Sequence, residues 1–166
     1  RGHSVTIITC SSKFREKVTQ MSIDGMKVIY LRVLYNQNMN ILRRLFSFLD
    51  FMLKSTYYSY KLKNIDLVIA TSTPLTVGFP ALVLNKLQRI PYLFEVRDLW
   101  PAVPIAMGGL KNKLLQRIAL SFEKLLYKNA KHIIALSPGM KSGVLKYKLD
   151  VGVTVIPNMS KNLEFW

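Results

Sequence analysis

Three charged residues, Glu95, Arg97 and Asp98, follow an apolar run in the segment FEVRDLWP at residues 94–101. A carboxylate in such a place can hold an arginine in position or accept a proton from a substrate hydroxyl. Open α/β sheets bind their ligands where parallel strands end. A solvated loop is the other interpretation of the same charges. The choice depends on whether residues 92–96 form a buried parallel strand.

Polar residues also follow two other apolar runs. Thr71, Ser72 and Thr73 end one of them, and Ser137 ends another. If these runs are parallel strands, the residues that follow them meet at one edge of the sheet. Turns and helix caps are the alternative for such residues, and for Ser72 and Ser137 we favour that alternative.

The remaining pattern alternates between apolar runs and segments of helical period. Continuous apolarity marks strands that are covered on both faces, as in a parallel sheet. The predicted strands are residues 5–9, 28–33, 67–71, 92–96, 132–136 and 153–156, and the predicted helices are 76–88, 112–129 and 138–148. Ser137 and Pro138 fit the cap and first turn of the last helix. The alternation predicts an α/β class: a Rossmann-like, doubly wound, mainly parallel sheet with helices on both faces.

Composition limits the function without choosing it. The 166 residues suit one ordinary domain, and 24 Lys and Arg against 9 Asp and Glu give a net charge of +15. Such a charge attracts nucleic acid, anionic lipid or phosphorylated small molecules. The single cysteine, Cys10, excludes an intramolecular disulfide. No metal-ligand cluster, phosphate-binding glycine motif or nucleophile elbow is visible in the sequence, and no apolar run reaches the length of a membrane span.

Residues 39–63 are both basic and aromatic. As a helix, the segment is apolar around most of its circumference, so more than one side must be covered. One interpretation is packing between the sheet and a neighbouring helix, and another is docking among anionic lipid headgroups. Stacking on single-stranded bases is a weaker third. The predicted membrane-docking residues are Arg43, Arg44, Phe48, Phe51, Lys54, Tyr57 and Tyr58.

Four blocks together resemble the N-terminal domain of family 4 glycosyltransferases: RGHSVTIIT, the stretch from DLVIATSTPLTVGFP to FEVRDLWP, LLYKNAKHIIALSPGM and VTVIPN. They look closest to bacterial sugar transferases that build surface polysaccharides, such as capsule and lipopolysaccharide, on a lipid carrier. The resemblance implies a GT-B architecture of two Rossmann-like domains. It implies transfer with retention of configuration, no metal ion and no cofactor, from a nucleotide-sugar bound mainly by the C-terminal domain. It also implies a lipid-linked glycan acceptor, no specific nucleic acid, and a cytoplasmic protein, peripheral on the inner face of the plasma membrane.

The resemblance also assigns residues. Asp98 keeps an aspartate that many relatives have after the same strand, and Arg97 stands where their histidine lies. Asp98 is therefore the expected catalytic or acceptor-orienting residue, with Arg97 and Glu95 in support. The expected acceptor-binding residues are Ser72, Thr73, Trp100 and Ser137. Asn158 matches the start of the interdomain hinge, although Met159 replaces the usual glycine.

The resemblance further implies that residues 1–158 are a partial acceptor-side domain without its first strand and helix. Residues 159–166 would then be a tail or linker toward a donor-binding domain, and this stretch alone would be inactive. A non-catalytic, basic membrane-anchoring subunit that recruits a separate donor-binding chain is the alternative from another class. A nucleic-acid-binding module, supported only by the charge, ranks third.

Overall fold

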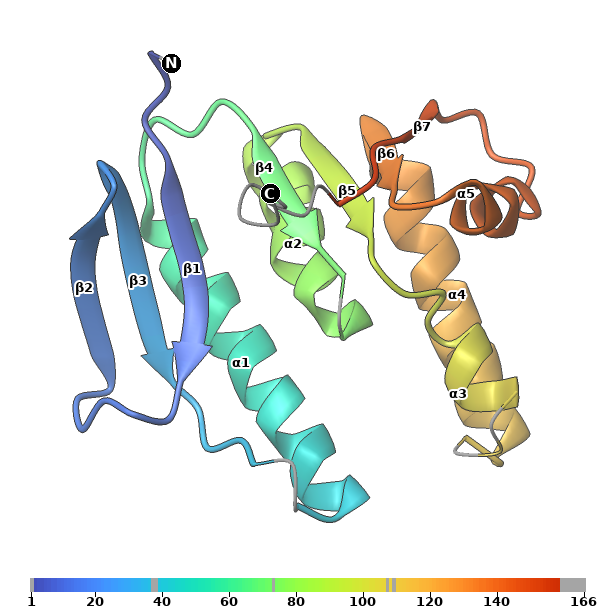
Figure 1. The fold of residues 1–166 in the computed structure, drawn as a ribbon, viewed down its shortest axis with the longest axis horizontal. Helices are drawn as coiled ribbons and strands as arrows, with labels where there is room; N and C mark the ends of the chain where they lie inside the picture. The colour runs from blue at the N-terminus through green and yellow to red at the C-terminus, as the bar shows by residue number, and fades with distance from the viewer. Residues whose placement is uncertain (1, 37–38, 73, 107, 109, 159–166) are drawn as a thin grey trace, which may run out of the picture. The chain divides into compact units, whose positions relative to one another are not determined.

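The computed structural model describes residues 2–36, 39–72, 74–106, 108 and 110–158. The chain divides into two compact units, Arg1–Asn64 and Ile65–Trp166 (Figure 1). Each unit is described by itself below.

The first unit holds a sheet of three strands in the order β1-β3-β2. Strand β1 (Thr6–Ser11) pairs in parallel with β3 (Met26–Arg32), and β2 (Val18–Ile23) pairs with β3 in antiparallel orientation. A tight turn joins β2 to β3 through Asp24 and Gly25, whose φ angles are 50° and 76°. An Asp-Gly pair favours this left-handed turn geometry. No strand is predicted for 18–23 from the sequence, because β2 is largely exposed and lacks a continuous apolar run.

One long helix, α1 (Ile41–Lys61), completes the first unit. The Asn40 side chain caps it by accepting a hydrogen bond from the Arg43 amide at 2.9 Å. Its buried face carries small residues, Ser47, Ser55 and Ser59. The Ser47 hydroxyl donates to the Leu34 carbonyl, just past β3. Small side chains on this face allow the helix to lie close to the strands.

The second unit holds four parallel strands in the order β4-β5-β6-β7. They are β4 (Val68–Thr71), β5 (Tyr92–Val96), β6 (His132–Ala135) and β7 (Val153–Val155), so the four strands predicted for this part are confirmed within one or two residues. The helical segments are η1 (Leu75–Val77), α2 (Gly78–Gln88), α3 (Ala102–Ala106), α4 (Lys113–Asn129) and α5 (Pro138–Leu145). The predicted α/β class with a parallel sheet and flanking helices is confirmed.

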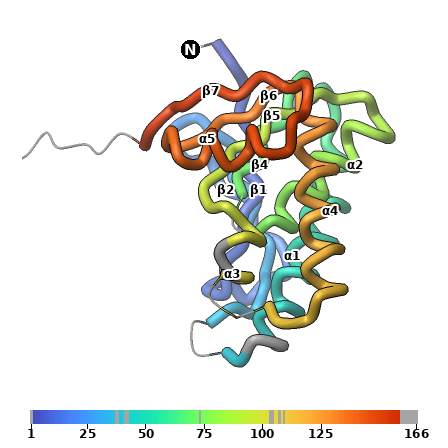
Figure 2. Tube along the Cα trace, turned by 90° about the vertical axis from the view of Figure 1, so that its right-hand side faces the viewer, coloured from blue at the N-terminus to red at the C-terminus, as the bar shows by residue number. Residues whose placement is uncertain are grey.

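The core of the second unit lies between its sheet and its helices. Alternate residues of β5, Tyr92, Phe94 and Val96, are fully buried. They join apolar residues of α2, α4 and α5 in one cluster: Ala81, Leu82, Leu126, Tyr127 and Val144. Figure 2 shows α2 and α4 side by side, and residues of the two helices are in contact. Right-handed crossovers in one direction along a sheet place successive helices on the same face.

Candidate functional site at the carboxyl ends of the parallel strands

The predicted site residues follow strands that end at one edge of the sheet. Thr71 pairs with Glu95, and Val96 pairs with Ala135. Ser72, Arg97 and the segment leading to Ser137 therefore leave the sheet side by side. Residues 92–96 are the buried parallel strand on which the interpretation of FEVRDLWP depended.

Ser72 joins the ends of β4 and β5. Its amide donates to the Glu95 carbonyl at 2.8 Å, and its hydroxyl oxygen accepts from the Arg97 amide at 3.0 Å. The residue is 2% exposed. We predicted Ser72 as an acceptor-binding residue, with a turn role as the favoured alternative. The structure gives its side chain a structural role: it fixes the backbone where the charged residues begin.

The segment after Asp98 is anchored by apolar side chains. The Trp100 amide donates to the Asp98 carbonyl at 2.9 Å, which forms a turn. Leu99 and Trp100 pack, half-buried, against the core. On α5, a β-carbon added to Gly143 would lie 2.7 Å from Leu99 Cδ2, so Leu99 would have to shift if this position were not glycine. Trp100 thus serves here as an anchor beside the site.

Arg97 and Asp98 are exposed between these two anchors, and Glu95 is half-buried. Glu95 is the fourth residue of β5, and Arg97 and Asp98 follow directly after the strand ends at Val96. An exposed carboxylate can orient or deprotonate a hydroxyl group. A guanidinium can pair with a phosphate through two parallel hydrogen bonds. The arrangement therefore offers a base and an anion-binding group at neighbouring positions.

The remaining predicted residues are Ser137, Thr73 and Asn158. The Ser137 hydroxyl oxygen accepts from the Met140 amide at 3.3 Å, so the residue caps α5, as the favoured interpretation predicted. Thr73 lies outside the described residues. Asn158 is exposed after β7, and its hinge role stays a prediction. The predicted linker at 159–166 also lies outside the described residues.

The predicted membrane-docking residues of α1 do not share one face. Arg43 and Tyr57 are exposed, whereas Phe48, Phe51 and Tyr58 are half-buried, with Phe48 stacked on Tyr35 at 5.8 Å between ring centroids. The other two predicted residues, Arg44 and Lys54, are half-buried as well. Lys54 pairs with Asp50 at 2.7 Å and also donates to the Arg32 carbonyl.

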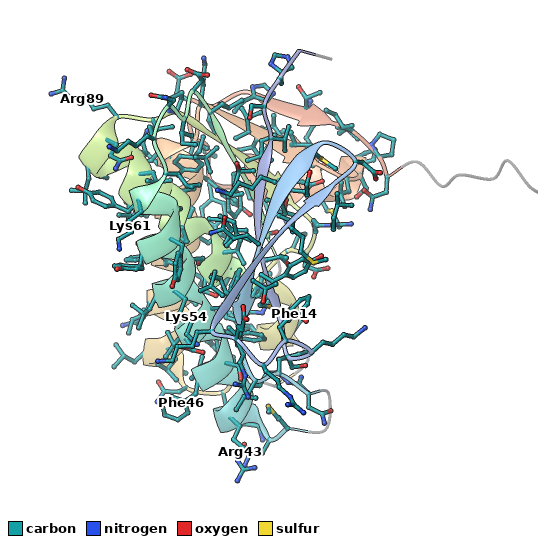
Figure 3. The ribbon with its side chains drawn as sticks, turned by 90° about the vertical axis from the view of Figure 1, so that its left-hand side faces the viewer. Phe14, Arg43, Phe46, Lys54, Lys61 and Arg89 are labelled. Atoms are coloured by element: carbon teal, nitrogen blue, oxygen red, sulfur yellow. The ribbon has the colours of Figure 1, made fainter. Side chains whose placement is uncertain are left out.

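A different set of α1 side chains is exposed. Phe46 is 70% exposed and Leu53 is 62% exposed. Together with their exposed neighbours they form what we call the α1 outer stripe: Leu45, Phe46, Leu49, Leu53, Tyr57 and Tyr60. Figure 3 shows Arg43 and Phe46 projecting from the N-terminal part of the helix. Lys61 lies over the Tyr57 ring, 4.2 Å from its centroid. A shallow groove of about 350 Å³ beside Phe46 is lined by Arg32 and Lys54 as well as by Asp50.

A buried carboxylate on α4, Glu123, was not predicted. It is 3% exposed and accepts hydrogen bonds from the hydroxyls of Tyr127, at 2.7 Å, and Tyr147. Burial raises the pKa of Glu123 above its ordinary value, and the hydrogen bonds from Tyr147 and Tyr127 oppose that rise. Burial likewise raises the pKa of Tyr127 and of Tyr147. A sequence signal existed: Glu123 is the one acidic residue in a helix that otherwise carries only basic charges.

Among the residues that the structure describes, no three His, Cys, Asp or Glu side chains gather as metal ligands would. No helix among those residues is long and apolar enough to cross a bilayer.

Comparison with known proteins supports the resemblance. The family model described as "Glycosyl transferase 4-like domain" matches residues 1–159. No curated protein sequence matches the chain. Among solved structures, the chain is similar to sucrose-phosphate synthase from Thermosynechococcus elongatus, with a TM-score of 0.63 and 16% sequence identity. The match covers 96% of this chain and 39% of that one, and at this identity it shows the fold alone.

Proposed function

The chain belongs to the glycosyl transferase 4-like family, and on that premise we propose that it is the acceptor-side part of a glycosyltransferase. The proposed enzyme moves a sugar from a nucleotide-sugar to a lipid-linked glycan acceptor in the synthesis of a bacterial surface polysaccharide. One observation supports the site most directly. The buried Ser72 hydroxyl holds the Arg97 amide, which fixes Arg97 and Asp98 at the carboxyl edge of the parallel strands.

The proposed chemistry assigns each charged residue a role. Asp98 orients the attacking hydroxyl of the acceptor and accepts its proton. Arg97 balances negative phosphate charge, and Glu95, two residues earlier in the chain, helps to position Arg97. The transfer retains the anomeric configuration and uses neither a metal ion nor a cofactor. A second domain of the complete enzyme holds most of the nucleotide-sugar, so residues 1–166 alone are inactive.

The proposed location is the inner face of the plasma membrane. The α1 outer stripe supports it, because aromatic and aliphatic side chains beside Lys and Arg are typical of helices that lie in the headgroup region. The groove beside Phe46 supplies Arg32 and Lys54, with Asp50 as their acidic neighbour. The net charge of +15 adds a general attraction to anionic lipid.

The test is transfer by the complete natural protein. Purified enzyme is incubated with a panel of nucleotide-sugars and with either a lipid-linked or a water-soluble glycan acceptor, and products are measured by mass spectrometry. We expect Asp98→Asn to lower kcat/KM by about 10²–10⁴-fold. Asp150→Asn, an exposed aspartate away from this edge, is the matched control. Full activity in Asp98→Asn would overturn the role of Asp98, and no transfer by the unmodified enzyme from any donor would overturn the proposed function.

A further inference from the structure

Helix α4 carries an exposed aliphatic face that the fold leaves uncovered. Leu114 is 65% exposed, Ile118 is 56% exposed and Leu125 is 44% exposed. At about 100° per residue, these three side chains fall within an arc of about 40° on the helix. Leu115, at 50% exposure, widens the arc. The residues of α4 that pack on the core are Phe122, Leu126 and Tyr127.

A row of cations runs beside the aliphatic face. Arg117, Lys124 and Lys128 are all exposed and fall within an adjacent arc of about 40°. The only acid on the helix, Glu123, is buried and held by two tyrosine hydroxyls. The outer surface of α4 therefore combines aliphatic side chains with positive charge alone. We call this surface the α4 docking face, made of Leu114, Leu115, Arg117, Ile118, Lys124, Leu125 and Lys128.

We propose that the α4 docking face binds the surface of an anionic lipid bilayer. The aliphatic side chains enter the boundary between headgroups and acyl chains, and the cations contact lipid phosphates. Charge complementarity supports this occupant, because no exposed acid on α4 opposes it. The apolar side chains of this face are leucine and isoleucine, which bury well among acyl chains. Surfaces that bind single-stranded nucleic acid use aromatic rings for stacking, and the α4 docking face has none, so a lipid surface is the better match.

This inference deepens the membrane part of the proposed function and rests on it. The α1 outer stripe belongs to the first unit and the α4 docking face to the second, so each unit holds one surface of the same chemistry. The two surfaces are testable separately, since substitutions in one helix leave the other helix unchanged.

The experiment measures binding of the complete protein to vesicles of phosphatidylcholine, with or without phosphatidylglycerol, by co-sedimentation. The α4 variant is Leu114→Gln with Ile118→Gln. The α1 variant is Phe46→Gln with Leu53→Gln. Leu87→Gln is the matched control, because Leu87 on α2 is 67% exposed and lies on neither surface. All of these side chains are exposed, so we expect the substitutions to leave the hydrophobic core intact. Circular dichroism checks that each variant is folded.

We expect the unmodified protein to bind only the vesicles that contain phosphatidylglycerol. The α4 variant should bind them at least about tenfold more weakly, while the Leu87→Gln control is unchanged. Unchanged binding by the α4 variant would overturn the inference, and a loss confined to the α1 variant would then leave the proposed membrane location standing. If the α4 variant lost binding to nucleic acid but still bound vesicles, that result would also overturn the inference that this face binds lipid. Sugar transfer to the water-soluble acceptor, assayed with the same proteins, reports on the proposed reaction independently of both surfaces.

Discussion

At the scale of single residues, Ser72 controls the geometry of the charged segment. Its buried hydroxyl accepts the Arg97 amide, so Ser72→Ala leaves a backbone donor without that partner. We expect unfolding to become easier by about 1–3 kcal/mol, and hydrogen exchange at the Arg97 amide to become faster. Denaturant titration and exchange measured by NMR check the two effects.

Ser137→Ala serves as the comparison for Ser72→Ala. It removes the cap of α5 and should cost about 1 kcal/mol, without changing exchange at Arg97. Equal exchange at Arg97 in both variants would show that the Ser72 hydroxyl does not fix this segment.

Glu123 makes stability depend on pH. Burial raises its pKa above the ordinary value of 4.5, so the folded chain holds this proton more tightly than the unfolded chain. The stabilisation from this group is complete below pH 4.5 and is lost as the pH rises through the folded pKa. Glu123→Gln cannot ionise. We therefore expect the free energy of unfolding of the unmodified protein, relative to Glu123→Gln, to fall as the pH rises above 4.5.

The measurement is denaturant unfolding across a pH series at fixed ionic strength. Tyr147→Phe provides the control, because it removes a hydrogen bond that lowers the pKa of Glu123. The fall in stability should then extend to higher pH. If the difference in free energy of unfolding between the unmodified protein and Glu123→Gln stays constant with pH, ionisation of Glu123 does not affect stability.

Residue-level roles differ in how far the sequence reveals them. The Ser137 cap was readable from Ser-Pro-Gly, because capping is a local pattern. The Ser72 contact joins residues 25 positions apart, and it depends on the register between β4 and β5. The sequence predicted which polar residues leave the strands, but no local pattern gives that register.

At the scale of elements, α5 packs closely against the turn at Leu99, and the point of closest approach is Gly143. An added β-carbon there would lie 2.7 Å from Leu99 Cδ2, whereas at Gly139 the nearest atom is 3.9 Å away. We expect Gly139→Ala to be neutral or to stabilise by up to about 1 kcal/mol, because alanine favours helices. Gly143→Ala should destabilise by about 1–3 kcal/mol through overpacking and should shift the NMR signals of Arg97 and Asp98. Equal stabilisation by both substitutions would refute the fit.

Elements were predicted well where one signal dominates. The four strands of the second unit are continuous apolar runs, and their type and limits follow from that pattern. Strand β2 was missed because an exposed strand has no such run. Helix α4 was predicted at 112–129 and lies at Lys113–Asn129, whereas residues 39–63 were considered as a helix whose covered side was left open. On α1 the apolar stripe lies outward, while serines pack inward, and periodicity alone does not say which side meets the sheet.

At the scale of the whole molecule, the question is whether the net charge or its placement decides membrane binding. Two triple substitutions separate these causes. The first variant changes three cations of the α4 docking face to Gln: Arg117, Lys124 and Lys128. The second changes three cations outside that face to Gln: Lys86, Lys146 and Lys148. All six side chains are exposed. Each set removes three positive charges, so both variants go from +15 to +12.

A general attraction would weaken equally in the two variants. We expect instead that the α4 set lowers affinity for vesicles containing phosphatidylglycerol by more than about tenfold, because each cation near an anionic surface contributes about 1 kcal/mol. The other set should change this affinity by less than about threefold. In physiological salt, screening limits the influence of a surface charge to about 8 Å, so cations away from the docking face contribute little. Co-sedimentation at two salt concentrations measures both. Equal weakening would assign the binding to net charge, and the placement of cations along α4 would then have no part in it.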